Sequence, residues 1–250
     1  MATSEAPRIL PAARQGFNSY ILPFIFANSP PTHDGVETLL HESGHAQHLL
    51  RCRAEELHDY RSAPMEFAEV ASMAMEAMAM ERLAGVYPPA EARRAVLGAL
   101  EGIARSLPWM ATVDAFQHWL YLNPEHTRAQ RQAQWVALRE RFLPGLDWSG
   151  LAEEQAHEWH RQGHVFEVPF YYIEYAIAQI GALQVWHRFR ADPAGAVRRY
   201  RAGLALGGSR PLPDLFAAAD LRFDPRGELL PELMAELEQA WDLNSLGTAS

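Results

Sequence analysis

The sequence contains a single cysteine, Cys52, and no apolar run long enough to form a membrane-spanning helix. A lone cysteine cannot form a disulfide within the chain, and proteins without disulfides are typical of a reducing cytosol. A spanning helix needs about 20 consecutive apolar residues, and none of the runs here has that length. We therefore expect a cytoplasmic protein that has no membrane partner.

Positive charge is also scarce. The chain has 22 Lys and Arg residues against 31 Asp and Glu residues, which gives a formal net charge of -9. No basic cluster and no basic amphipathic helix offers a local exception. Because nucleic-acid binding depends on positive charge that meets phosphates, this composition argues against DNA or RNA as a partner.

Linkers, internal repeats and low-complexity tracts are missing as well. A chain of 250 residues with 48% hydrophobic content can bury a sizeable core, and it usually forms one large domain or two small ones. Since no linker separates two halves, we expect a single domain over residues 1–250.

The pattern HESGH at residues 41–45 is the most informative feature that the sequence does contain. Histidines four residues apart lie on one face of a helix, so both imidazoles reach one ion while Glu42 points at the ion's open position. The flanking apolar residues predict a helix from about Asp34 to Cys52, with Asp34 as the N-cap and Glu37 at N3. An HExxH motif inside a helix is typical of a zinc hydrolase.

A catalytic zinc usually takes three protein ligands, so His41 and His45 need a third residue. The metzincin class would place Gly at position 48 and His at position 51. His48 and Arg51 stand there instead, which excludes that class.

The third ligand is expected in the apolar segment 66–78, which contains only four polar residues: Glu66, Glu69, Ser72 and Glu76. The last three fall within roughly 60° of one another on a helix. Because carboxylates are almost never buried without a partner, this stripe calls for a cation. Glu69 is the best third ligand and Glu66 is the reserve, while Glu76 is placed to accept a hydrogen bond from a ligand histidine.

The remaining sequence predicts a mainly α fold with a short N-terminal β element near the active site. The apolar run 20–27 is too short for a signal-peptide core and is interrupted by Pro23, so its aromatic and β-branched residues favour a strand beside the site. Proline and glycine breaks divide the rest into helices over about 65–84, 90–106, 109–122, 125–142, a Ser149-capped segment to 161, 168–189, 192–205 and 228–242.

Residues 164–176 are rich in aromatic side chains, and periodicity leaves two interpretations open. Tyr171, Tyr172 and Tyr175 could be core residues of a helix entered through Pro169, or they could face an active site. A peptidase needs a hydrogen-bond donor for the oxyanion of its tetrahedral intermediate, and a Tyr or His near the zinc can supply one. That requirement favours the second interpretation.

Five stretches share a pattern with one known family: residues 16–28, ETLLHESGHAQH at 37–48, AEVAS at 68–72, HVFEVPFYYIEYA at 164–176 and GGSRPLP at 207–213. Together they resemble the oligoendopeptidase F branch of the thimet oligopeptidase family of zinc metallopeptidases. The resemblance covers nearly the whole chain. It implies a multi-helix zincin catalytic lobe that hydrolyses peptide bonds in short oligopeptides.

The resemblance also implies roles for individual residues. One Zn²⁺ per chain is held by His41, His45 and Glu69. Glu42 is the general base that takes a proton from the zinc-activated water and later passes it to the leaving amine. Tyr175 matches the family's oxyanion tyrosine best, and Tyr172, His164 and Tyr171 are the other candidate donors.

Members of this family carry a long helical region ahead of the zinc helix, which forms the other wall of a substrate channel. Only about 35 residues precede the predicted zinc helix here, so we expect the catalytic lobe alone. A truncated reading frame, a split-gene subunit and a short complete enzyme all stay open. The expected partners are short peptide substrates, together with a second copy of the chain or a complementing helical lobe.

Two other functions compete with a self-sufficient peptidase. The chain could be a noncatalytic zinc-stabilised helical module, or one half of a split two-chain peptidase. The presence of Glu42 favours a catalytic site, because a purely structural zinc site needs no general base. An all-α binding domain with an accidental HExxH is disfavoured by the acidic stripe of residues 69–76.

Overall fold

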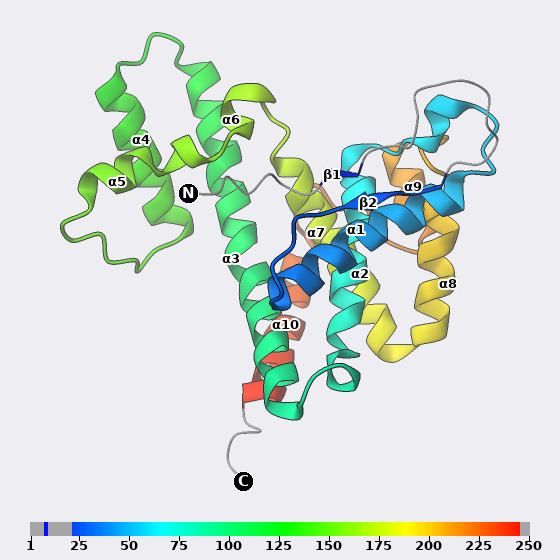
Figure 1. Cartoon of the computed structure of the whole chain (residues 1–250). Helices are drawn as coiled ribbons and strands as arrows, with labels where there is room; N and C mark the ends of the chain where they lie inside the picture. The colour runs from blue at the N-terminus through cyan, green and yellow to red at the C-terminus, as the bar shows by residue number, and fades with distance from the viewer. Residues whose placement is uncertain (1–7, 10–21, 246–250) are drawn as a thin grey trace. The chain divides into compact units, whose positions relative to one another are not determined.

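The computed structural model describes residues 8–9 and 22–245 (Figure 1). Within them it has ten α-helices, three short 3₁₀ helices and one two-stranded sheet. The predicted mainly α fold is therefore confirmed. No helix in the described part of the chain is both long and apolar enough to cross a membrane.

The chain divides into two compact units. The first unit comprises Met1–Leu100 and Ile177–Ser250, and the second comprises Glu101–Ala176. Two helices run through the boundaries between them: α3 (Pro89–Leu122) and α7 (Ile173–Ala191). The expected single domain stays a prediction.

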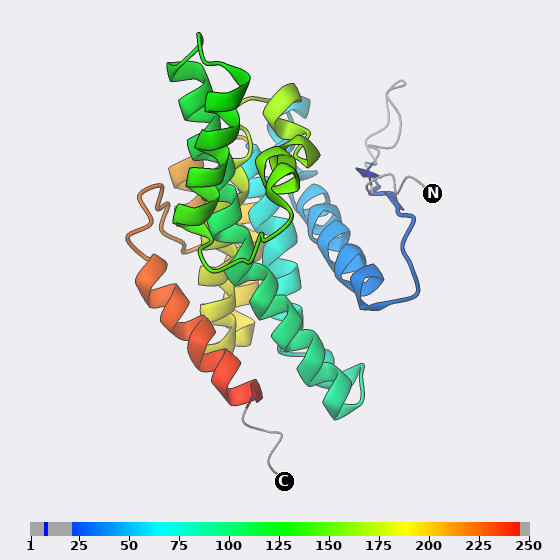
Figure 2. The same ribbon diagram turned by 90° about the vertical axis from the view of Figure 1, so that its left-hand side faces the viewer.

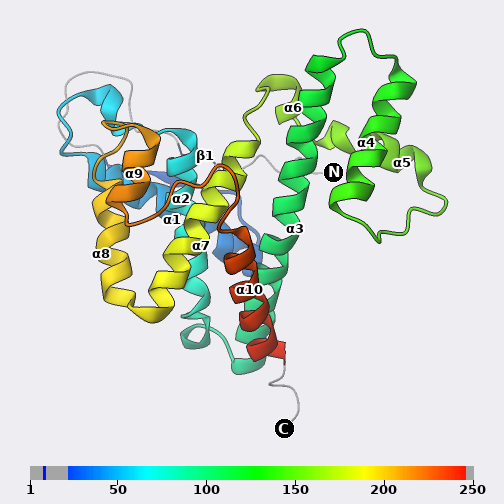
Figure 3. The same ribbon diagram turned by 180° about the vertical axis from the view of Figure 1, so that it is seen from behind.

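The first unit holds most of the helices, and Figure 3 shows its side with α8 and α9. Besides parts of α3 and α7, its α-helices are α1 (His33–Cys52), α2 (Met65–Met80), α8 (Pro193–Leu204), α9 (Leu212–Ala218) and α10 (Leu230–Ser245). Its 3₁₀ helices are η1 (His58–Arg61) and η2 (Leu83–Gly85). Its core lies between α2 and the helices α7 to α9, and includes the fully buried Phe67, Val70, Leu204 and Leu215.

Helices α1 and α2 lie side by side along much of their length (Figures 1 and 2). Gly44 is at their point of closest approach. A Cβ atom at that position would lie 2.4 Å from the Ala71 carbonyl oxygen and 2.5 Å from the Ser72 Cα atom. Only glycine lets the two backbones pack this closely. The same Ala71 carbonyl accepts a hydrogen bond of 2.7 Å from the buried Tyr200 hydroxyl on α8.

A short antiparallel sheet lies near the start of the first unit. Strand β1 (Arg8–Ile9) pairs with β2 (Ile25–Phe26) so that Arg8 faces Phe26 and Ile9 faces Ile25. β2 contacts α1, which agrees with the predicted β element beside the zinc helix. Residues 20 and 21 of the predicted strand lie outside the described residues.

The second unit contains the later part of α3 and the start of α7. Its other helices are α4 (Arg128–Phe142), α5 (Ala152–His157), η3 (Glu158–Arg161) and α6 (His164–Glu167). α4 begins at a capping box in which Thr127 and Gln130 bond each other's backbone. The core of the second unit is formed around Phe116, Trp135 and Trp159.

Some predicted helix ends are wrong. The N-cap of α1 is Thr32, two residues before the predicted Asp34, which lies in the first turn instead. The predicted cap Ser149 lies before α5, whose N-cap is Leu151. Helix α9 was not predicted, although Pro213 in its first turn could have indicated it.

The predicted break at Pro108 is also wrong, because α3 continues through it. A proline inside a helix removes one backbone hydrogen bond, at a cost of about 3 kcal/mol. The residues that follow are buried in the core, among them Met110, Val113 and Phe116. Burial of these side chains offsets the lost bond, since each contributes about 1.5–3 kcal/mol.

The predicted helix 168–189 starts five residues later than expected, at Ile173. Phe170 has a φ angle of 64°, in the left-handed region, so it cannot belong to a right-handed helix. Tyr171 and Tyr172 therefore precede α7, and only Tyr175 lies within it.

Candidate metal centre

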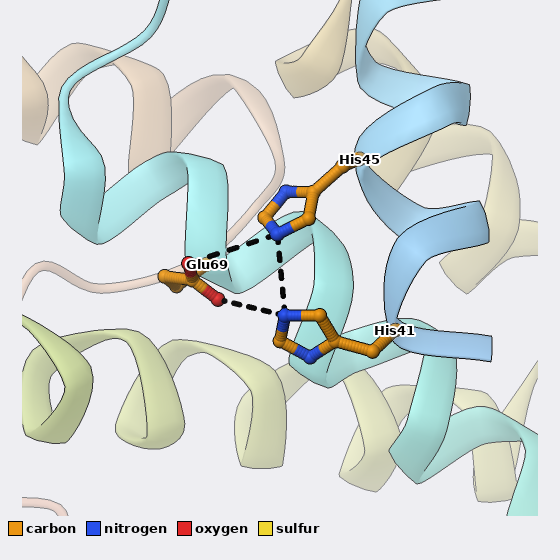
Figure 4. A group of neighbouring side chains, drawn as sticks. All are labelled: His41, His45 and Glu69. Carbon is orange, nitrogen blue, oxygen red and sulfur yellow. Dashed lines mark hydrogen bonds and ion pairs between the residues drawn. The ribbon is translucent and has the colours of Figure 1, made fainter. Parts of the chain in front are cut away.

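Three side chains from α1 and α2 converge on one point (Figure 4). The Nε2 atoms of His41 and His45 are 3.2 Å apart. The Glu69 carboxylate lies 3.4 Å from His41 Nε2 through Oε2 and 3.6 Å from His45 Nε2 through Oε1. One ligand atom from each residue is thus available to a single ion.

The separation of the two imidazole nitrogens is close to that of two ligand atoms in a tetrahedral zinc site. Zinc bonds to nitrogen and oxygen of about 2.0–2.2 Å, at tetrahedral angles, place any two ligand atoms about 3.3–3.6 Å apart. The two histidine Nε2 atoms are 3.2 Å apart, and they lie 3.4 and 3.6 Å from different oxygens of the Glu69 carboxylate. Two imidazoles and one carboxylate are also a donor set that catalytic zinc takes, so His41, His45 and Glu69 fit this ion.

The local sequence explains why these groups meet. His41 and His45 are separated by one turn of α1, so their rings lie one above the other on the face toward α2. Gly44 on α1 allows the close approach of α2, which brings Glu69 within reach. The Glu69 side chain is only 7% exposed, so its carboxylate needs the positive partner that a metal ion supplies.

Hydrogen bonds orient both histidines so that their Nε2 atoms face the centre. His41 Nδ1 lies 2.5 Å from Glu76 Oε1 on α2, which is the role that the sequence predicts for Glu76. The His45 ring is hydrogen-bonded to the backbone of Ala68. Such partners fix the tautomer and the ring orientation of a ligand histidine.

The Glu69 carboxylate is also held. Ser72 Oγ donates to Glu69 Oε2 at 2.7 Å, and the same hydroxyl lies 3.0 Å from the Glu69 carbonyl oxygen. Ser72 is fully buried. Ser72 belongs to the polar stripe that the sequence shows, but no role was predicted for it, although its spacing of three residues from Glu69 could have indicated one.

Burial and charge act on the two histidines in different ways. Burial, together with the charge of His41, lowers the pKa of His45 to about 4, which keeps this ring neutral and able to bind a metal. Burial also lowers the pKa of His41, but its hydrogen bond to Glu76 and the nearby carboxylates outweigh burial and raise it.

Glu42 lies beside the cluster and is 5% exposed. Burial raises the pKa of its carboxyl; the charge of His41 opposes this shift and that of Glu69 adds to it. A carboxylate whose pKa lies above its ordinary value is a stronger base near neutral pH.

Neither Glu66, the reserve ligand, nor the nearby His48 joins the cluster. Glu66 is in the first turn of α2, and its carboxylate is not among the converging ligand atoms. His48, one turn beyond His45, is buried and packs edge-on against Phe67 with ring centroids 6.0 Å apart.

The candidate oxyanion donors form a ring cluster in the second unit. The His164 ring centroid lies 5.8 Å from Tyr171, 5.0 Å from Tyr172 and 5.8 Å from Tyr175. Tyr172 also packs against the core, as the alternative interpretation of this block holds. Because the cluster and the metal centre belong to different units, the oxyanion role stays a prediction.

The described part of the chain thus combines a mainly α fold with a candidate metal centre to which the HExxH helix contributes two histidines. Residues 11–234 match the model of peptidase family M3, and the chain therefore belongs to this family. The resemblance to oligoendopeptidase F is confirmed. A comparison with curated protein sequences finds no match.

Solved structures of similar fold carry related names. PZ peptidase A with an inhibitor is 31% identical, with a TM-score of 0.82 over 89% of this chain and 40% of that chain. A protein assigned as oligoendopeptidase F is 33% identical, with a TM-score of 0.81 over 88% and 39% of the two chains. A protein from Bacillus anthracis, assigned likewise, is 29% identical, with a TM-score of 0.73 over 88% and 36%. The chain thus spans roughly two fifths of the length of these proteins.

Proposed function

We propose that this chain is a zinc-dependent endopeptidase that hydrolyses peptide bonds in short oligopeptides. The observation that carries the proposal is the convergence of His41, His45 and Glu69, whose ligand atoms lie within 4.8 Å of one another, with Glu42 beside them. Membership of peptidase family M3 supports peptides as the substrate class. The single cysteine is consistent with a cytoplasmic enzyme.

When bound, the ion supplies Lewis acidity, which makes a water more acidic and polarises the substrate carbonyl. Glu42 takes the proton of the attacking water and passes it to the leaving amine, so it acts first as base and then as acid. Its raised pKa suits both halves of this transfer. Glu76 and Ser72 keep His41 and Glu69 aimed at the ion.

The oxyanion that forms as water attacks needs a hydrogen-bond donor. We assign this role to Tyr175, with Tyr172 or His164 as further donors, on the strength of the family resemblance of residues 164–176. A phenol donates without changing its protonation near neutral pH, because its ordinary pKa is about 10.

The test is to measure bound zinc and peptide turnover together in the purified chain and in the Glu42→Gln variant. The wild-type chain should carry close to one zinc and cleave a quenched short peptide. Glu42→Gln should keep its zinc and lose turnover, because an amide can occupy the same space but cannot accept the proton. Wild-type turnover in this variant would show that the mechanism is wrong.

The same experiment separates a noncatalytic zinc-stabilised module from an enzyme. If the chain is such a module, the wild type and the Glu42→Gln variant should both bind zinc, and neither should cleave the peptide. Half of a split peptidase would gain turnover when a separately expressed helical lobe is added, so that addition is the third arm of the assay.

A further inference from the structure

Phe170 has a strained backbone, and the packing of its ring does not account for the strain. Its φ angle is 64°, and among the described residues the only other non-glycine residue with a positive φ is Asp220, at 59°. For a bulky aromatic residue this conformation is an outlier, because Cβ crowds the backbone. Strain of this kind persists where the surroundings impose it, and it clusters at functional sites.

The Phe170 ring is not a core residue that would offset the strain by burial. It is 36% exposed and rests on two other exposed rings, with centroids 4.9 Å from His118 and 5.0 Å from Tyr121. Tyr121 itself is 58% exposed. We call His118, Tyr121 and Phe170 the aromatic platform.

The rest of the platform is held in place by α3. His118 and Tyr121 are three residues apart on this helix, so their rings lie on one face. His118 Nε2 lies 3.6 Å from the carboxylate of Asp114, one turn earlier, which limits the motion of the imidazole. Phe170 reaches the platform from the segment before α7, immediately ahead of the tyrosines that surround His164.

We propose that Phe170 determines specificity, and that the aromatic platform binds a large apolar side chain of the peptide substrate. Exposed ring faces gain dispersion and hydrophobic contact when an aromatic or branched aliphatic side chain covers them. The strained backbone holds the Phe170 ring on the platform and out of the core. Because Phe170 shares its segment with the candidate oxyanion tyrosines, the platform belongs to the part of the chain assigned to substrate. This inference rests on the proposed peptidase function.

The experiment measures peptide affinity by calorimetry, in the zinc-loaded Glu42→Gln background so that peptides stay intact. The probes are a hexapeptide of alanine and glycine and its derivatives with one phenylalanine at each position in turn. The derivative that the parent protein prefers most strongly over the all-small peptide is then used for the platform variants. Phe170→Ala should weaken binding of this derivative about tenfold and leave affinity for the all-small peptide within about twofold.

Two further variants test whether the ring itself is responsible. Phe170→Trp should retain the preference, because it keeps an aromatic face. Phe166→Ala is the matched control: Phe166 is 58% exposed in the same unit but stacks on Trp159, away from the platform rings, and its loss should leave the preference unchanged.

A comparison of Phe170→Gly with Phe170→Ala separates strain from recognition. Both substitutions remove the ring, but only glycine removes the backbone strain of the positive φ. The Gly variant should therefore melt about 2 to 6 °C higher than the Ala variant. Both should lose the phenylalanine preference equally. Equal weakening for both peptides, or an unchanged preference in Phe170→Ala, would overturn the assignment.

Failure of the aromatic-platform proposal can be distinguished from failure of the peptidase proposal. A wild-type chain that binds peptides with a Phe170-dependent preference but never cleaves them would contradict the hydrolytic function alone. A wild-type chain that cleaves peptides while its Phe170→Ala variant keeps the same selectivity would contradict the platform alone. Concentration-dependent self-association lost in Phe170→Ala, with peptide affinity unchanged, would assign the platform to a second copy of the chain and overturn the proposal.

Discussion

The Ser72 hydroxyl donates a 2.7 Å hydrogen bond to Oε2 of Glu69, the carboxylate oxygen nearest His41. Both residues are buried on α2, so no bulk water replaces this bond if the hydroxyl is removed. The carboxylate of Glu69, the candidate third ligand, is thus fixed from within its own helix, one turn away.

Ser72→Ala should therefore lower zinc affinity by about 10- to 100-fold, the usual effect of losing a partner of a metal ligand. Competition with a zinc chelator gives the affinity without relying on turnover. Ser106→Ala is the matched control, because Ser106 makes the same backbone bond, to Ile103, but lies outside the centre. An equal loss of zinc affinity in both variants would mean that the effect comes from reduced helix stability and not from the Ser72–Glu69 hydrogen bond.

The identity of the third ligand can be tested by metal content. Glu69→Ala should lose most of its zinc, because it leaves two ligands and removes the buried negative charge. Glu66→Ala should keep its zinc, since Glu66 lies outside the cluster. Elemental analysis of the two purified variants decides between them, and full zinc content in His41→Ala would refute the centre as a whole.

Gly44→Ala should destabilise the fold and weaken zinc binding together. The new Cβ would stand 2.4 Å from the Ala71 carbonyl oxygen, so α1 and α2 must separate. Overpacking of this kind costs about 1–3 kcal/mol or more. Urea unfolding checks the prediction.

Gly98→Ala provides the opposite control for Gly44→Ala. Gly98 is a helical glycine in the same unit, and a Cβ there meets nothing within 4 Å. Since alanine favours a helix over glycine by roughly 0.5–1 kcal/mol, this variant should be more stable than wild type. A stabilised Gly44→Ala would show that the helices do not touch as described.

Asp224 should make stability depend on pH in the acid range. Burial raises the pKa of its carboxyl, but backbone hydrogen bonds, including one of 2.7 Å from Leu229, outweigh burial and lower it. The folded pKa thus lies below the unfolded value of about 3.9, so this stabilisation is present above that value and is lost as pH falls through the folded pKa.

The measurement is urea unfolding of wild type and Asp224→Asn at a series of pH values. The stability difference between the two should be largest near neutral pH and should shrink below about pH 4. A difference that stays constant down to pH 2 would show that the carboxylate charge plays no part.

The sequence predicted the parts of this structure that depend on local periodicity. The start of helix α1 was placed within two residues of its observed position because its histidines and apolar residues repeat at helical spacing. Glu69 was identified because an acidic residue inside an apolar helix needs a positively charged partner. Glu76, two turns further along the same stripe, was predicted to accept a hydrogen bond from a ligand histidine, and in the structure that histidine is His41.

What the sequence did not predict depends on tertiary contacts. The continuation of α3 through Pro108 reflects burial of side chains that sequence propensity does not count. The positive φ of Phe170 is set by its surroundings, and nothing in the residue type indicates it. The contact of Gly44 with Ala71 needs the distance between two helices, which no single helix encodes.

The close packing of α1 and α2 also bears on the order of events during synthesis. All groups that would hold or orient the ion lie between His41 and Glu76, whereas the helices that cover the core side of α2 are α7 to α9, more than 90 residues later in the chain. The loop between the two helices is short, so closing it costs little entropy and takes little time. The residues of the candidate centre therefore leave the ribosome before α7 to α9 have been synthesised. A zinc ion bound at that stage would link α1 to α2 before the helices that pack on the apolar side of α2 have been synthesised.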